Sequence, residues 1–277
     1  MLTPRGVDGG VELECRVNER GRTCISNQYF SPPVHLSKPY FDKESASLLV
    51  NLSCPTAGLL EGDRVVSSIE VGSGASLVVT TPGATRAHFM RSGLALVEQR
   101  LVVRAGGFLE FNPGALILQR QANLRQDTTL EIEEGGEALL VEKLLPGRLA
   151  HGEVFAFDRF ASRLRVRMKG RLVLLESFRL SPEDESILPW KKSFPEPIYG
   201  AFYLFSEKVS EGLPSRDEIH AMATGKLLVG SSALNGPGGW VIKLLAADAL
   251  SFKGAVNRIR ELLHCDLGRK PTAFRRY

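Results

Sequence analysis

Polar residues recur at matching positions within apolar segments of this 277-residue chain. Four segments share a glycine followed six residues later by a polar residue: Gly74 and Thr80, Gly106 and Asn112, Gly136 and Glu142, and Gly170 and Glu176. Glu110 lies two residues before Asn112, which places both side chains on one face of a strand. Stacked in register, these groups would form an internal acidic column whose oxygens could pass a divalent cation along. The alternative is that the acids face solvent or pair with nearby lysine and arginine.

A second candidate site is the stretch TAGLLEGD, from Thr56 to Asp63, which joins two strand-like segments. Gly58 and Gly62 lie four residues apart, and Asp63 follows the second glycine directly. A phosphate loop needs lysine at the position of Asp63, so the stretch does not predict phosphate binding. The glycines predict a turn between strands, and the carboxylate beside them is a candidate oxygen ligand.

Sequence signatures of common catalytic sites are missing. The chain has no G-x-S-x-G, GxxxxGK[ST] or H-E-x-x-H motif and no GxGxxG motif leading into a helix. Its five histidines are isolated from one another, and its four cysteines form no CxxC pair. His264 and Cys265 are neighbours, but adjacent side chains on a helix do not face each other and would not chelate one ion. The sequence predicts no permanently bound metal or cofactor.

The elements that must position the acids are mainly strands. Short alternating segments bounded by glycine or proline predict them, as in VELECRV, SASLLVNLS and LVLLESFRL. Helical periodicity appears only toward the C-terminus, where Ser215 and Glu218 resemble a capping box for a helix that ends near Gly225. A second helix, from Phe252 to about Gly268, has one apolar face. The four prolines of segment 181–200 predict a long surface loop.

An internal repeat organises the strands. Four units start at Ile69, Leu101, Leu130 and Leu164, which are 32, 29 and 34 residues apart, and each reads strand, glycine turn, strand. A near-regular period predicts stacked layers, because one layer alone cannot bury its apolar face. The predicted fold is a single domain over residues 1–277: an elongated stack of β-hairpin-like units, similar to a β-helix, with about two α-helices toward the C-terminus. An ordinary all-β protein with several glycine turns is the alternative.

Charge and hydropathy restrict the classes of function. The net charge is +4, and the segment 251–277 alone carries +5, so the basic character belongs to the C-terminal part. Few aromatic residues accompany the basic tail at 269–277, so it predicts a solvated terminus or a docking tail and not nucleic-acid binding. The chain has no apolar run of the length that spans a bilayer, and acidic residues near its start do not fit a signal peptide. We therefore expect a cytoplasmic protein that does not enter membranes.

A series of motifs resembles one family, the urease accessory proteins called UreD, or UreH in some bacteria. The motifs occur in family order from about Thr56 to the C-terminus: TAGLLEGDRV, VVTTPGATRAHFMRS, FLEFNPGALIL, KLLPGRLAHGEVF and DLGRKPTAFRRY. Each motif alone is weakly specific, whereas their order is specific. The sequence departs from the family pattern at Ala57, at Glu61 and at Asn112–Gly114.

The resemblance implies a non-enzymatic scaffold with a β-helical fold. Such proteins bind a dimer of the helical accessory protein UreF, recruit the GTPase UreG, contact apo-urease and help deliver nickel. The missing phosphate loop fits this expectation, because GTP hydrolysis would belong to the partner. Asp63, Glu142 and Glu176 are similar to family acids that line a nickel path, and Glu110 joins them from the repeat. Nickel would be a transient cargo of these acids.

Two other classes of function compete with this interpretation. A stand-alone β-rich binding module for a saccharide or a protein would use the repeat only for rigidity. A hydrolase built on the scattered acids is the third hypothesis. Neighbouring genes for urease subunits would distinguish the first class from the second, and activity on simple esters or glycosides would support the third.

Overall fold

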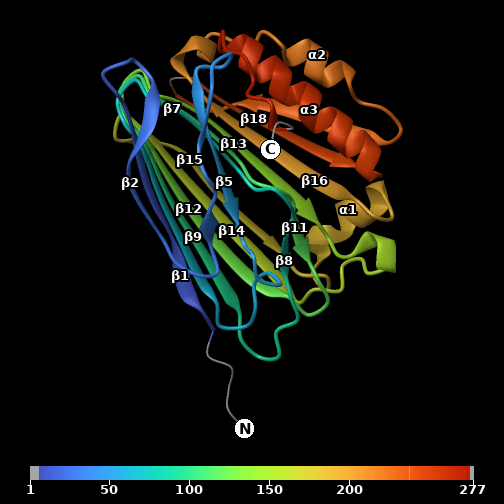
Figure 1. Ribbon diagram of the computed structural model, residues 1–277. Helices are drawn as coiled ribbons and strands as arrows, with labels where there is room; N and C mark the ends of the chain where they lie inside the picture. Colours follow the sequence, from blue (N-terminus) through green and yellow to red (C-terminus); the bar gives the residue numbers. More distant parts are fainter. Residues whose placement is uncertain (1–5, 237, 275–277) are drawn as a thin grey trace.

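The computed structural model describes residues 6–236 and 238–274. Within this part the chain forms a β-solenoid of about four turns, with two sheets that face each other (Figure 1). The first sheet has the order β15-β14-β12-β9-β6-β1-β2. Its strands are β1 (Asp8–Val17), β2 (Thr23–Phe30), β6 (Arg64–Val71), β9 (Ala95–Val103), β12 (Asn123–Ile132), β14 (Arg159–Met168) and β15 (Arg171–Leu180).

The second sheet has the order β17-β18-β16-β13-β10-β7-β5-β3. These strands are β3 (His35–Leu36), β5 (Ser47–Ser53), β7 (Ser76–Thr80), β10 (Phe108–Asn112), β13 (Glu137–Leu145), β16 (Ile198–Phe205), β17 (Leu227–Ala233) and β18 (Gly239–Ala246). Three short strands lie off this path: β4 (Tyr40–Asp42), β8 (Thr85–Ala87) and β11 (Leu116–Leu118). Strand β8 pairs with β11 and β11 pairs with the end of β13, so the solenoid has a short third side.

The predicted stack of repeats is confirmed, and the structure adds how its strands pair. Equivalent strands of successive turns pair in parallel, as β6 does with β9 and β7 with β10. The two strands of each of the first three units therefore belong to different sheets and do not form a hairpin. Left-handed glycines make the corners, with φ of 66° at Gly74 and 65° at Gly106 and Gly135. The fourth unit is a true antiparallel hairpin of β14 and β15, which ends the parallel ladder of the first sheet.

The helices cover the outer face of the second sheet and one end of the stack (Figure 1). They are α1 (Leu188–Ser193), α2 (Arg216–Ala221) and α3 (Ala249–Asp266), with short 3-10 turns η1 (Leu149–His151), η2 (Glu185–Ile187) and η3 (Glu207–Val209). Helix α3 confirms the predicted apolar face, which packs against β16 and β18. Its first turn is capped by the Asp248 side chain, which accepts a hydrogen bond from the Ser251 amide. Ser215 does not cap α2 as predicted, because its hydroxyl donates to Asp266 instead, at 2.5 Å.

Two further segments differ from the sequence prediction. The segment 181–200, predicted as a loop, contains η2, α1 and the start of β16. Proline is tolerated at the first turn of a helix, which is where Pro189 lies. The tail is packed up to Phe274: Thr272 is buried, and the Arg269 guanidinium donates to Glu137 at 2.9 Å. The last three residues of the predicted basic tail, 275–277, lie outside the described residues.

Two apolar cores result from this arrangement. The larger lies inside the solenoid between the two sheets, and the smaller lies between the second sheet and α3. Alternation along the strands of the second sheet decides which side chain enters which core. Leu140 belongs to the interior core, whereas its neighbours Leu139 and Val141 belong to the core under α3. No helix among the described residues has the length and apolar character needed to cross a membrane.

Candidate functional site

The predicted acidic column is not formed in register. Thr80 and Asn112 do occupy equivalent positions on β7 and β10, as the count of residues predicts. At the corner before β13, however, the left-handed glycine equivalent to Gly74 and Gly106 is Gly135, whereas the sequence prediction counts from Gly136. Because side chains alternate along a strand, this shift of one residue turns Glu142 to the opposite face of the sheet. The four predicted acids therefore occupy three separate environments.

Glu110 lies under α3, where its carboxylate is fully buried and fully paired. Its oxygens accept hydrogen bonds from Arg260 Nε at 2.5 Å and Nη2 at 2.8 Å, and from His264 Nε2 at 3.0 Å. The side chain of Asn112 donates a further bond at 2.9 Å. Burial by itself would raise the pKa of Glu110, but the charge and hydrogen bonds of Arg260 and the bond from His264 hold that pKa well below its ordinary value. This carboxylate is an ionised anchor for α3.

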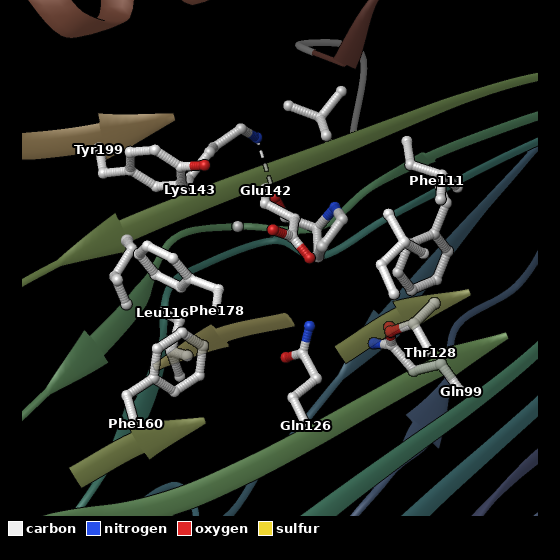
Figure 2. Close-up of a pocket in the computed structure, with 16 residues that line it drawn as sticks. Gln99, Phe111, Leu116, Gln126, Thr128, Glu142, Lys143, Phe160, Phe178 and Tyr199 are labelled. Carbon is white, nitrogen blue, oxygen red and sulfur yellow. Dashed lines mark hydrogen bonds between the residues drawn. The ribbon is translucent and has the colours of Figure 1, made fainter. Parts of the chain in front are cut away.

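Glu142 lies on the other face of the second sheet, inside the solenoid. It lines a cavity of about 70 Å³ between the two sheets. Figure 2 shows Glu142 extending into this cavity from one wall and Gln126 from the opposite wall, with Gln99 and Thr128 nearby. Thr128 donates to the Gln99 side chain at 2.7 Å, so the wall opposite Glu142 carries polar groups on a strand surface that is otherwise apolar.

A second cavity, of about 290 Å³, continues the hollow interior toward the N-terminal turns of the solenoid. It shares Gln99, Phe111 and Pro113 with the first cavity, which shows that the two spaces adjoin. Cys54 also lines it, as a free thiol. The interior of the solenoid is therefore partly hollow, with polar groups at intervals along its walls.

The electrostatics of Glu142 differ from those of Glu110. Burial and the nearby Glu176 carboxylate raise the pKa of Glu142 to about 7, and the Tyr203 hydroxyl and Lys243 only partly oppose them. The hydrogen bond from Tyr203 is long, at 3.4 Å. Lys243 pairs with Glu176 at 2.7 Å instead. Near neutral pH Glu142 is therefore present in both protonated and ionised forms, next to the ion pair of Lys243 with Glu176.

An aromatic stack closes the cavity beside Glu142. The rings of Phe178, Trp190 and Tyr199 form a cluster in which every pair is in contact, with centroids 5.7 Å apart for Phe178 and Trp190, 5.5 Å for Phe178 and Tyr199, and 5.0 Å for Trp190 and Tyr199. Phe178 and Tyr199 come from the two facing sheets and Trp190 comes from α1. The short helix in the proline-rich segment thus packs Trp190 against two residues that line the cavity, Phe178 and Tyr199.

Asp63 holds a turn and lies apart from both glutamates. Its oxygens accept hydrogen bonds from the backbone amides of Val7 and Leu60, both at 2.8 Å. The two glycines of the same stretch have positive φ, 137° at Gly58 and 83° at Gly62, as tight turns require. A Cβ on Gly58 would lie 2.3 Å from the carbonyl oxygen of Arg86. The stretch TAGLLEGD joins β5 to β6 and fastens the segment before β1.

The sequence prediction missed the partners of both glutamates. Arg260 and His264 are four residues apart on the buried face of α3, which is a detectable signal for a buried acid opposite them. Lys243 and Tyr203 carry no comparable signal, because Lys243 is the one charged residue of an apolar strand and Tyr203 is one of two tyrosines in another. They reach the acidic pair only through the long-range pairing of β13, β16 and β18.

No assembled metal centre is present in the part of the chain that the structure describes: no three His, Cys, Asp or Glu side chains lie close enough to hold an ion. The fold and the site thus define a β-solenoid with a partly hollow interior and a carboxylate pair in its wall. A family model described as UreD urease accessory protein matches residues 7–277.

Curated relatives cover nearly the whole chain. The urease accessory protein UreD of Opitutus terrae is 36% identical over 260 residues, 92% of this chain and 93% of that protein. Those of Haloarcula marismortui and Yersinia enterocolitica are each 30% identical, over 91% and 94% of this chain and 84% and 83% of the respective proteins. The chain belongs to the UreD family.

Proposed function

We propose that this chain is a non-catalytic maturation factor for urease, which acts with UreF and UreG to insert nickel into the apoprotein. Family membership over nearly the full length supports the role in maturation. The observation that carries the nickel proposal is Glu142, which lines the cavity inside the solenoid, together with the partly exposed Glu176 carboxylate close enough to raise its pKa. Ni²⁺ is cargo here and passes this pair on its way through the interior.

The pair has the chemistry of a transient cation site. Carboxylate oxygens bind divalent ions, and two such groups with one lysine leave negative charge to be balanced when Glu142 is ionised. Arrival of Ni²⁺ displaces the proton of Glu142 and weakens the pair of Lys243 with Glu176. Two ligands alone do not retain the ion, which suits transfer better than storage. Asp63 and Glu110 lie outside this path, because their oxygens already accept backbone or guanidinium hydrogen bonds.

The test replaces Glu142 and Glu176 by glutamine, singly and together, in a reconstituted activation of apo-urease with UreF and UreG. The amide keeps shape and an acceptor oxygen but loses the charge that compensates a desolvated divalent ion. We expect an intact complex, with nickel bound to urease lowered at least about tenfold in the double variant if the lost charge costs about 1.4 kcal/mol or more in the barrier.

Glu131→Gln is the matched control, because Glu131 is an exposed carboxylate on the outside of the first sheet. Complex yield and nickel content are measured in the same preparations. Full nickel loading by the double variant in an intact complex would refute the path through the pair. Loss of the complex itself would show that the two acids serve structure instead.

A further inference from the structure

The outer face of the first sheet carries a row of arginines with no function in the proposal above. Strand β14 reads RFASRLRVRM, and its inward residues, Phe160, Leu164 and Val166, are buried in the solenoid core. Alternation therefore turns Arg163 and Arg165 outward. Arg159 lies on the same side of β14, and Arg179 joins from β15, where it pairs with Ala161. We call Arg159, Arg163, Arg165 and Arg179 the arginine face.

These four arginines have no acidic partner among the described residues. Elsewhere on the same outer surface arginines do find carboxylates: Arg64 pairs with Glu98 and Arg104 pairs with Glu70. Asp127 lies beside Arg163 in the parallel register but is paired with Arg125 at 2.6 Å. Like charges on adjacent positions of a sheet destabilise it, so this face is unfavourable unless something neutralises it.

The arginine face is also hollowed. A depression of about 270 Å³ is lined by Arg159, Arg163 and Arg179, together with Ser177. A second depression, of about 580 Å³, is lined by Arg165 with two further arginines and two acids, Arg100, Arg167, Glu70 and Glu131. Two leucines of the edge strand β15 pair with arginines of β14, Leu172 with Arg167 and Leu175 with Arg165, and they are 48% and 56% exposed. Guanidinium groups around a hollow with apolar residues at its margin are typical of a protein interface.

The chemistry of this face favours carboxylates as the ligand. Guanidinium groups bind carboxylates and phosphates through two parallel hydrogen bonds. Nucleic acid is disfavoured because the outward positions of β12, β14 and β15 include no aromatic residue for stacking on bases. Leu172 and Leu175 would instead contact apolar residues of a protein.

We propose that the arginine face docks an acidic surface segment of a partner protein, whose carboxylates enter the depressions beside β14. The segment alternates glutamate or aspartate with aliphatic residues. This interaction does not depend on nickel and uses the opposite side of the first sheet from the hollow interior.

The experiment measures binding of a fluorescein-labelled peptide, in which glutamate pairs alternate with leucine, to the purified full chain by fluorescence anisotropy. We expect the double variant Arg163→Glu and Arg165→Glu to bind at least about tenfold more weakly at low salt, because it reverses two contacts at the centre of the face. The control is Arg216→Glu with Lys253→Glu, which makes the same change of net charge at exposed residues of α2 and α3. Thermal unfolding of both variants verifies that they are folded.

Three results would overturn the proposal. The first is equal loss of peptide binding in both double variants, which would indicate a non-specific effect of net charge. The second is tighter binding of a single-stranded oligonucleotide of matched charge than of the peptide. The third is self-association of the unmodified chain that the substitutions at Arg163 and Arg165 abolish, which would assign the face to a second copy. Selective loss in the first variant, with raised affinity for a lysine-rich peptide, would support it.

Discussion

Glu110, which is buried, and Glu142, which is half-buried, lie on adjacent strands of the second sheet and face opposite ways. Glu110 faces α3 and accepts hydrogen bonds from a guanidinium, an imidazole and a side-chain amide. Glu142 faces the hollow interior and receives one long hydrogen bond from Tyr203. The pKa of the first is held below its ordinary value, and the pKa of the second is raised to about 7. The same residue type is therefore an anchor on one face and a titratable group on the other.

The comparison shows that burial alone does not decide whether a carboxylate is a structural group or a group that can bind a ligand. A buried carboxylate that is fully paired has no lone pairs left for a ligand and contributes to stability only while its partners remain. A buried carboxylate with few partners keeps its binding capacity and lowers stability when it ionises. Structural and functional acids therefore differ in their partners, and each of the following experiments changes one of these acids or one of its partners.

The largest expected effect comes from removing the partner of Glu110. Arg260→Ala leaves a buried carboxylate without its main counter-charge, which should lower the free energy of unfolding by about 3–5 kcal/mol. It also removes the bond from Arg260 to the Thr272 carbonyl and the stacking of its guanidinium on Phe274, so the tail should become sensitive to protease. Urea denaturation monitored by circular dichroism measures the change.

The control for this prediction lies on the same helix. Arg258 pairs with Glu218, and both side chains are about half exposed. Arg258→Ala should therefore cost no more than about 1 kcal/mol. Equal costs for the two substitutions would contradict the assignment of Glu110 as the anchor of α3.

The second prediction concerns pH and Glu142. Its pKa is higher in the folded chain, about 7, than its ordinary value of 4.5, so between these values the folded state binds more protons than the unfolded state. Stability should fall as pH rises from about 4.5 to 7 and then level off, by up to about 3.5 kcal/mol at about 1.4 kcal/mol per unit of pKa. Glu110 has a lowered pKa, so its contribution is lost only in acid, below its ordinary value.

Glu142→Gln isolates this effect, because the amide does not titrate. The difference in unfolding free energy between the unmodified chain and the variant, measured by urea denaturation from pH 5 to 8, should change with pH over that interval. A difference that is constant with pH would show that Glu142 is ionised throughout and that its interior position does not raise its pKa.

Local patterns predicted much of this fold, and long-range partners could not be predicted. The repeat and the apolar face of α3 follow from spacing within a few residues, which is why both were confirmed. The acidic column failed because Gly135 and Gly136 are adjacent, and choosing the wrong one reverses the face of every later residue in β13. The contact of Glu110 with Arg260 spans 150 residues, so only the folded chain reveals it.

The third prediction uses Asp63 as a carboxylate with a different kind of partner. Its oxygens accept hydrogen bonds from two backbone amides. Asp63→Asn would replace one acceptor oxygen by an NH₂ donor that faces the amide of Val7 or Leu60. We expect a loss of about 1–3 kcal/mol in unfolding free energy. Hydrogen exchange should increase at the start of β6 and in residues 6–10. Nickel delivered per intact complex should not change, which would distinguish Asp63 from Glu142.

The smallest expected effect is that of Tyr203→Phe, which removes the one hydroxyl that donates to Glu142. The bond is 3.4 Å long, so its loss should change unfolding free energy by less than about 1 kcal/mol. That bond favours the ionised carboxylate, so without it the pKa of Glu142 should rise further and the pH at which stability levels off should move upward. Denaturation from pH 6 to 9 locates that point. A downward shift of this pH would mean that the hydroxyl stabilises the protonated acid. Glu142 would then be a neutral structural group and not a ligand available to a cation.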